Sequence, residues 1–402
     1  MRVYLSACGI GLGHASRVHS IADYLKRKHP EVKLYFSTYG DGVEYIKSKG
    51  YRYSVAPAMK LIEHADGTID SKRTAIHALI KGVPTFIKQV IFEIRKIKQF
   101  KPDVIFADTR LSTVIAGWLL RIPTYTILNQ LRILIPHVKP LTKRKKQIKY
   151  FGELIILHMI MVLWNRSKRI FVSDFPDELT ISKDTLSIPK NLAKKVEFIG
   201  PIINIDIFEK LHKSVDKNAV FKKLKTHEYS YLIYAGLSGT KQEVLPLMKK
   251  LKEIFLKLQF NALFVISLGQ PKENKFRRNR NVILLSWVDD RTELLRASDL
   301  YIGRPGQLSV AETYYTMKPA IWIPSPAHTE QITNAKSSQL LGVSVLLYQH
   351  QLSPERLEKT IHYLLKSPKV KENLKRVYDK VIHYHSLKRI LNVTEEHALG
   401  EK

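Results

Sequence analysis

The amino-acid sequence predicts an α/β protein built of two doubly wound domains that face each other across a cleft. Short apolar runs alternate with longer amphipathic stretches in the first half, and the same alternation begins again near residue 230. A glycine–proline pair, Gly200-Pro201, punctuates the chain between the two halves. Since 402 residues suffice for two domains of about 100–200 residues each, we place the domains at 1–199 and 200–402.

The elements of the first domain follow from local patterns. Short apolar runs bounded by turn residues indicate buried parallel strands, and amphipathic stretches indicate the helices that cover them. In chain order we expect a strand at Arg2–Ala7, a helix at His14–Lys28, strands at Val32–Ser37 and Val104–Ala107, a helix around Thr113–Leu120 and a strand at Thr124–Leu128.

The second domain repeats this arrangement. We expect strands at Ser230–Ala235, Ala262–Leu268, Val282–Leu285, Asp299–Ile302 and Ala320–Ile323, with an amphipathic helix at Glu243–Leu258. In two such domains the carboxyl ends of the parallel strands would line the cleft, where ligands bind in this class of fold.

The composition narrows the classes of partner. The chain has 66 Lys+Arg against 36 Asp+Glu, a formal charge of +30, which favours nucleic acid, an anionic membrane surface or phosphate-rich ligands. Lysine-rich, solvated helix faces explain the same charge without any such partner. The single cysteine, Cys8, excludes a disulfide framework within the chain and favours a reducing compartment. We expect no signal peptide, because the first residues lead directly into a strand.

A glycine-rich loop follows the first strand. Gly9, Gly11 and Gly13 leave its backbone open to a ligand, and His14 begins the next helix. The pattern is neither the dinucleotide fingerprint nor a P-loop. A histidine here can act as a general base, since its pKa lies near neutrality; it can also simply cap the helix.

Asp108 is the second catalytic candidate. It follows an apolar run and should emerge at the carboxyl end of a neighbouring strand. There its carboxylate could orient the imidazole of His14, as in a triad. The alternative is that Asp108 caps the following helix.

The stretch from Gly303 to Val343 suits a nucleotide sugar. Arg304 and the turn ending at Gly306 can meet a diphosphate. Glu312 can accept hydrogen bonds from both ribose hydroxyls, and Gln331 and Asn334 offer amides to a sugar. Taken singly, each could be an ordinary surface charge, cap or salt-bridge partner. An earlier loop, "AGLSGT", offers Ser238 and Gly239 as a second phosphate cradle, and "SWVDD" offers the backbone of Val288 to a base.

These motifs resemble a known family. "GLGH" near the amino terminus and "GRPGQLSVAE…P…EQITNA" near the carboxyl terminus are similar to those of GT-B glycosyltransferases, whose two domains are Rossmann-like. Within that fold the chain resembles the bacterial lipid-linked UDP-GlcNAc transferases that make lipid II and the eukaryotic dolichol-linked chitobiose synthase. It most resembles the single-chain archaeal enzymes that add the second GlcNAc to a dolichol-linked sugar.

The resemblance implies an inverting transfer of GlcNAc from UDP-GlcNAc to dolichol-diphosphate-GlcNAc in β-1,4 linkage. Glu312 would hold the ribose, Gln331 and Asn334 the sugar, and Val288 would lie beside uracil. Ser238, Gly239 and Arg304 would lie along the diphosphate, with His14 as the base. One departure concerns the sugar: Glu330 stands where the bacterial motif has a histidine, and His328 lies two residues earlier. The terminal helix is expected to pack back on the first domain.

We expect neither a metal nor another cofactor, since no Asp-x-Asp motif is present. An apolar segment flanked by cations, Glu153–Trp164, is too short to cross a bilayer and fits in-plane attachment to anionic lipid. An interior helix is the alternative. This predicts a peripheral protein at the cytoplasmic face of the membrane, and the residues expected in the lipid are Leu154, Ile155, Ile156, Met159 and Trp164.

Two other functions fit parts of the pattern. A UDP-GlcNAc epimerase of the same fold would need cleft carboxylates and no lipid patch. A binder of nucleic acid or another polyanion would need aromatic residues interleaved with its cations, whereas here the cations flank an aliphatic segment, so we expect no nucleic-acid partner. The sequence leaves the oligomeric state open.

Overall fold

The computed structural model describes residues 1–9, 12–58, 82–129, 131, 142, 147, 150, 160–186, 188–227, 229–237, 241–269, 276–326 and 328–398. The chain divides into two compact units. The first comprises 1–174, 185–205 and 385–402, and the second comprises 175–184 and 206–384. The division near residue 205 lies close to the expected boundary, but short segments of each half belong to the other unit.

The first unit is built on a parallel sheet of seven strands in the order β3-β2-β1-β4-β5-β6-β7. Its strands are β1 (Arg2–Ala7), β2 (Lys33–Thr38), β3 (Tyr53–Val55), β4 (Val104–Asp108), β5 (Thr124–Leu128), β6 (Arg169–Val172) and β7 (Val196–Phe198). The helices of this unit are α1 (Gly13–Lys28), α2 (Asp41–Ser48), α4 (Val83–Phe100), α5 (Leu111–Leu119) and α8 (Lys190–Ala193). The short helix α7 (Lys183–Leu186) has two residues in each unit.

Alternate residues of β1 serve two cores, because successive side chains of a strand point to opposite faces of a sheet. Val3 and Leu5 pack in one cluster with residues of α1. Tyr4 packs on the other face with residues of α4 and α5. Both faces are therefore covered by helices, as all-parallel sheets require.

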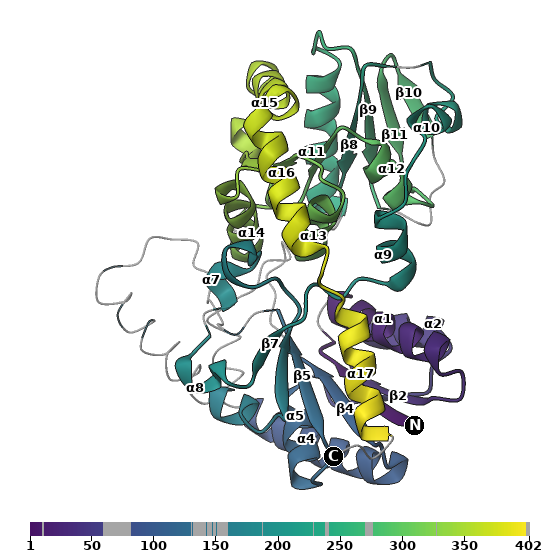
Figure 1. The fold of residues 1–402 in the computed structure, drawn as a ribbon, viewed down its shortest axis with the longest axis vertical. Coiled ribbons are helices and arrows are strands. Elements are labelled where there is room, and N and C mark those ends of the chain that lie inside the picture. The colour runs from purple at the N-terminus through teal and green to yellow at the C-terminus, as the bar shows by residue number, and fades with distance from the viewer. Residues whose placement is uncertain are drawn as a thin grey trace. The chain divides into compact units, whose positions relative to one another are not determined.

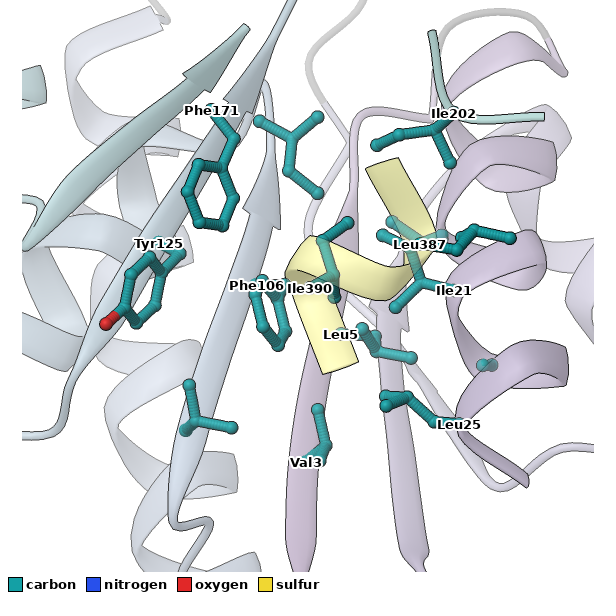
Figure 2. Packing of buried hydrophobic residues seen from close by; sticks show 14 of the residues in the cluster. Val3, Leu5, Ile21, Leu25, Phe106, Tyr125, Phe171, Ile202, Leu387 and Ile390 are labelled. Carbon is teal, nitrogen blue, oxygen red and sulfur yellow. The ribbon is translucent and has the colours of Figure 1, made fainter. Parts of the chain in front are cut away.

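The last helix, α17 (Ser386–Ala398), belongs to the first unit. Leu387 and Ile390 lie in the same buried cluster as Leu5 and Ile21, as Figure 2 shows. The sequence placed this helix at the end of the 200–402 domain. In the structure it belongs to the first unit instead.

The second unit has a seven-stranded sheet in the order β10-β11-β9-β8-β12-β13-β14. Its strands are β8 (Tyr231–Gly236), β9 (Ala262–Ser267), β10 (Phe276–Asn279), β11 (Val282–Leu285), β12 (Leu300–Gly303), β13 (Ala320–Trp322) and β14 (Ser344–Leu346). All pairings are parallel except that of β10 with β11. The antiparallel β10 forms one edge of this sheet.

Helices surround this second sheet (Figure 1). They are α9 (Ile205–Leu211), α10 (Lys217–Lys223), α11 (Lys241–Phe255), α12 (Arg291–Ala297), α13 (Gln307–Tyr315), α14 (Thr329–Leu340), α15 (Pro354–Lys366) and α16 (Pro368–Val381). Ser353 and Ser367 cap α15 and α16 through their side chains, and a proline opens each of these helices. The expected α/β architecture of two doubly wound sheets is confirmed.

Candidate active site

Each sheet has one point at which the chain changes the direction in which it adds strands. In the first sheet this point lies between β1 and β4, and in the second between β8 and β12. Ligands of doubly wound proteins bind outside the carboxyl ends of the strands at this point. The glycine loop with His14 follows β1, and Asp108 ends β4; Arg304 follows β12. The sequence candidates therefore lie at the expected edges.

The imidazole of His14 is hydrogen-bonded to the carboxylate of Asp108. Residues Ala7 and Asp108 are paired in register on β1 and β4, and His14 Nδ1 lies 2.8 Å from Asp108 Oδ1. The Asp108 side chain is fully buried, whereas that of His14 is 18% exposed. Asp108 does not cap α5, whose N-cap residue is Arg110 and has no side-chain capping bond.

A guanidinium that the sequence analysis missed completes this arrangement. Arg17 Nη1 donates to both oxygens of Asp108, at 3.2 and 3.1 Å, and Thr109 Oγ1 donates to Asp108 Oδ1 at 3.1 Å. Burial by itself raises the pKa of Asp108, but the charges of Arg17 and His14 and the hydrogen bonds from His14 and Thr109 outweigh it and hold that pKa below its usual value. The available signal was spacing: Arg17 lies three residues after His14, on the same face of α1.

The glycines of the loop have distinct roles. A Cβ on Gly9 would lie 1.7 Å from the backbone oxygen of Tyr39, so only glycine fits there. A Cβ on Gly13 would meet no atom of the described residues within 4 Å, so these residues leave space at the start of α1. Gly11 lies outside the described residues.

The carboxylate of Glu312, a residue of helix α13, is buried. It is 3% exposed, and both of its oxygens accept hydrogen bonds from Nη2 of Arg291. The charge of Glu312 outweighs the effect of burial and raises the pKa of Arg291. The reading of Glu312 as a surface charge is therefore wrong. Arg291 was also missed by the sequence analysis, because its partner lies on a different helix.

A cavity of about 250 Å³ opens beside this pair. Val288 lines it together with Trp287 and Arg291, and its place beside uracil stays a prediction. Its other lining residues include Tyr234, Ser267, Gly269, Ile207 and Lys210. An indole and aliphatic side chains beside carboxylates and cations form the mixed surface that suits a nucleoside.

The side chain of Arg304 does not lie where the sequence predicted, at a position free to meet a diphosphate. It is 4% exposed, and its guanidinium donates to the carbonyl of Ile323 at 2.8 Å and to that of Glu243 at 3.4 Å. These carbonyls lie just after β13 and in the first turn of α11. Arg304 therefore holds two segments of the second unit together from inside. The physical reason is burial: a buried guanidinium must satisfy its donors with nearby acceptors.

The amides expected to hold the sugar also support the site's backbone. Asn334 Nδ2 donates to the carbonyl of Pro305 at 3.0 Å, while its buried Oδ1 has no hydrogen-bond partner among the described residues. Gln331 Oε1 accepts a hydrogen bond from the backbone of Ser325 at 2.8 Å. A Cβ on Gly306, at the start of α13, would meet no atom within 4 Å in the part of the chain that the structure describes, so the backbone there is open toward a ligand.

The remaining candidates are mostly outside the described part of the chain. This holds for Ser238 and Gly239 and for four residues expected in the lipid: Leu154, Ile155, Ile156 and Met159. The fifth, Trp164, is 4% exposed and packs in a core cluster with Ile170, so it does not face a membrane; the interior reading holds for this residue. Within the described residues no group of three His, Cys, Asp or Glu side chains could hold a metal ion.

Comparison with known proteins agrees with this fold and these motifs. Residues 208–388 match the glycosyltransferase family 28 C-terminal domain, and residues 1–175 match a glycosyltransferase family 1 model. An uncharacterized glycosyltransferase of Methanosarcina mazei is 25% identical, with full coverage of both chains. The UDP-N-acetylglucosamine–N-acetylmuramyl-(pentapeptide) pyrophosphoryl-undecaprenol N-acetylglucosamine transferase of Caldicellulosiruptor saccharolyticus is 22% identical, over 98% of this chain and 97% of its own.

Solved structures show the same fold. Acinetobacter baumannii MurG superposes with a TM-score of 0.65 at 15% identity, and the match covers 98% of this chain and 99% of that protein. The protein therefore has the two-domain α/β architecture of the GT-B fold, and each of its halves matches a glycosyltransferase family model.

Proposed function

We propose that this glycosyltransferase transfers GlcNAc from UDP-GlcNAc to a lipid-diphosphate-linked sugar, with inversion at the anomeric carbon. The hydrogen-bonded set of His14, Asp108 and Arg17 at the switch point of the first sheet carries the proposal. The finer assignment is dolichol-diphosphate-GlcNAc as acceptor and a β-1,4 linkage. That assignment rests on the resemblance of the sequence motifs to the archaeal enzymes.

The hydrogen bonds define the protonation state that a base requires. Asp108, with its lowered pKa, is ionised at neutral pH and can only accept. Nδ1 of a neutral His14 must therefore carry the proton, which leaves the lone pair on Nε2 for the substrate. In the proposed reaction Nε2 takes the proton of the acceptor hydroxyl as its oxygen bonds to the anomeric carbon. The bond from that carbon to the diphosphate oxygen breaks, and UDP leaves with the electron pair.

The second unit would hold the donor. Glu312 can accept hydrogen bonds from the ribose hydroxyls while Arg291 keeps its charge balanced, and the cavity beside Val288 would take the uracil. The open backbone at Gly306 faces the departing diphosphate in this proposal, since helix amino termini attract anions. We propose that these groups stabilise the leaving charge without a metal ion, so EDTA should leave the rate unchanged.

Replacement of His14 tests the base assignment. In His14→Ala the transfer rate should fall by about 10²–10⁴-fold, while UDP binding, which uses the second unit, stays intact. His19→Gln, on the same helix, is the matched control. The assay measures labelled GlcNAc transferred to a lipid-diphosphate-GlcNAc acceptor, and UDP affinity by calorimetry. Full activity in His14→Ala would refute the base, and UDP release without an acceptor would favour the epimerase.

We also propose that the protein contacts anionic lipid at the cytoplasmic face of the membrane. No helix among the described residues is long and apolar enough to span a bilayer. On α4, however, Val83, Ile87 and Ile91 are 61%, 52% and 45% exposed, and their spacing of four residues places them along one stripe. Lys88 and Arg95 are exposed on the same helix. An apolar stripe beside cations is typical of a helix that lies in the membrane interface.

Flotation with vesicles tests the lipid contact. Ile87→Glu should weaken association with anionic vesicles at least several-fold, because a charge replaces an exposed apolar side chain in the stripe. Leu340→Glu is the matched control, since Leu340 is an equally apolar residue, 81% exposed, in the second unit. Equal flotation of both variants would exclude α4 as the contact.

A further inference from the structure

A buried ion pair lies close to the candidate base. Arg110 and Glu93 are 3% and 0% exposed, and Arg110 Nη2 donates to Glu93 Oε1 at 2.7 Å. Two hydroxyls, those of Tyr4 and Ser37, also donate to Glu93, at 2.7 and 2.6 Å. Such a pair stabilises a fold no better than apolar residues of the same size. Its presence calls for a role in fixing one particular geometry.

Arg110 joins the ends of the two strands that carry the site. Its Nη1 donates to the carbonyl of Ala7, the last residue of β1, at 3.2 Å. The residue itself follows β4 and stands two positions after Asp108. Through Glu93 on α4, one guanidinium therefore fixes both the strand that leads into the His14 loop and the strand that ends in Asp108.

Between Asp108 and Arg110 the backbone is strained. Thr109 has a φ of +54°, a left-handed conformation that is unfavourable for a β-branched residue. Strained residues of this kind persist only where their surroundings enforce them, and they cluster at functional sites. The bonds of Asp108 to His14 and Arg17 fix the backbone before Thr109. Those of Arg110 to Glu93 and Ala7 fix the backbone after it.

We propose that Arg110 is a positioning residue for the transfer reaction. Its bonds to Glu93 and to the Ala7 carbonyl hold the strained turn at Thr109, and this turn aligns Asp108 with Nδ1 of His14. The inference rests on the proposed role of His14 as the base. We call the two bonds of Arg110, to Glu93 and to the Ala7 carbonyl, the anchor. Loss of the anchor lets Thr109 relax to a negative φ, which moves the carboxylate of Asp108 away from the imidazole of His14.

The test removes the anchor without leaving a bare charge in the core. In Arg110→Met combined with Glu93→Gln, kcat should fall by about 10- to 100-fold, since small misplacements of catalytic groups have effects of this size. The KM for UDP-GlcNAc should not change, because the proposed donor residues belong to the second unit. The control, Arg389→Met with Glu197→Gln, removes another ion pair of the first unit and should leave kcat unchanged.

A rescue experiment separates positioning from a general loss of structure. Adding Thr109→Gly to the double variant should bring kcat back to most of the value of the Thr109→Gly single variant, because glycine adopts a positive φ without strain. The single variant controls for the hydrogen bond from Thr109 Oγ1 to Asp108 that this substitution removes. If the double variant does not fold, Arg110→Lys replaces it. A lysine keeps the charge but cannot bond Glu93 and Ala7 from two separate nitrogens, so kcat should again fall and recover with Thr109→Gly. Absence of rescue in a folded variant would overturn the proposal.

Proton NMR of the His14 imidazole gives a readout that does not depend on activity. The hydrogen-bonded Nδ1 proton, assigned by its loss in His14→Ala, should disappear in the anchor variant and return with Thr109→Gly. An unchanged resonance would overturn the positioning role, whatever the rate does. If the resonance responds as expected but the unmodified protein transfers no GlcNAc to any lipid-linked acceptor, the positioning role stands and the proposed function fails.

Discussion

Replacement of Arg17 by methionine is the most informative perturbation of the candidate base. Arg17 and His14 share the buried carboxylate of Asp108. At 3.1 Å the attraction between Arg17 and Asp108 is about 5 kcal/mol for an effective dielectric constant of about 20. Breaking a buried pair typically costs about 3–5 kcal/mol. We expect a value near the lower limit, about 3 kcal/mol, because His14 and Thr109 still donate to the carboxylate.

The loss should appear in the pH dependence of the reaction. With Arg17 gone, a protonated His14 is the remaining cation next to the carboxylate among the described contacts of Asp108, so the inactive, protonated enzyme gains stability. The attraction lost with Arg17 sets an upper limit on this effect: about 3 kcal/mol corresponds to at most about two pH units, because each unit is worth about 1.4 kcal/mol. The acid limb of the kcat profile should therefore move to higher pH by about one to two units in Arg17→Met.

The assay is steady-state transfer measured between pH 5 and 9. Arg27→Met is the matched control, since Arg27 lies on the same helix but pairs with Asp23 at the exposed surface. This pair should contribute at most about 1 kcal/mol and leave the profile unchanged. If Arg17→Met keeps the acid limb of the unmodified protein, Arg17 does not balance the charge of Asp108 and the reasoning fails.

The other predictions concern donor binding, folding and acid stability. Glu312→Gln should weaken UDP binding by about 10- to 100-fold in calorimetry, since hydrogen bonds to charged groups contribute about 1.5–3 kcal/mol; an unchanged Kd would remove Glu312 from the donor site. Gly9→Ala should destabilise the protein by about 1–3 kcal/mol or more through its clash with Tyr39, whereas Gly13→Ala should not lower the melting temperature. The lowered pKa of Asp108 stabilises the fold fully above about pH 4, its unfolded value, and this contribution disappears as the pH falls through the folded value. Arg17→Met should therefore begin acid unfolding at a higher pH, as followed by circular dichroism.

The sequence by itself determined the order of the strands along the chain, the presence of two sheets and the sheet edges at which the candidate residues lie. A strand that is covered by helices on both faces, such as the one at Val104–Ala107, is apolar at almost every position. Such a strand can therefore be recognised from the local sequence alone. The glycine loop and His14 follow one such run, and Asp108 ends another. Their positions at a switch point therefore followed from local signals alone.

Only the tertiary structure decided which side chains meet. Arg17, Arg110 and Arg291 read as ordinary basic residues in a chain of net charge +30, yet each pairs with a buried carboxylate. Arg304 has the sequence position of an anion ligand, but its donors satisfy carbonyls inside the second unit. The terminal helix α17 likewise joins the first unit through contacts across most of the chain. Local patterns cannot reveal such pairings, because the free energy of a buried charge depends on partners that are distant in sequence.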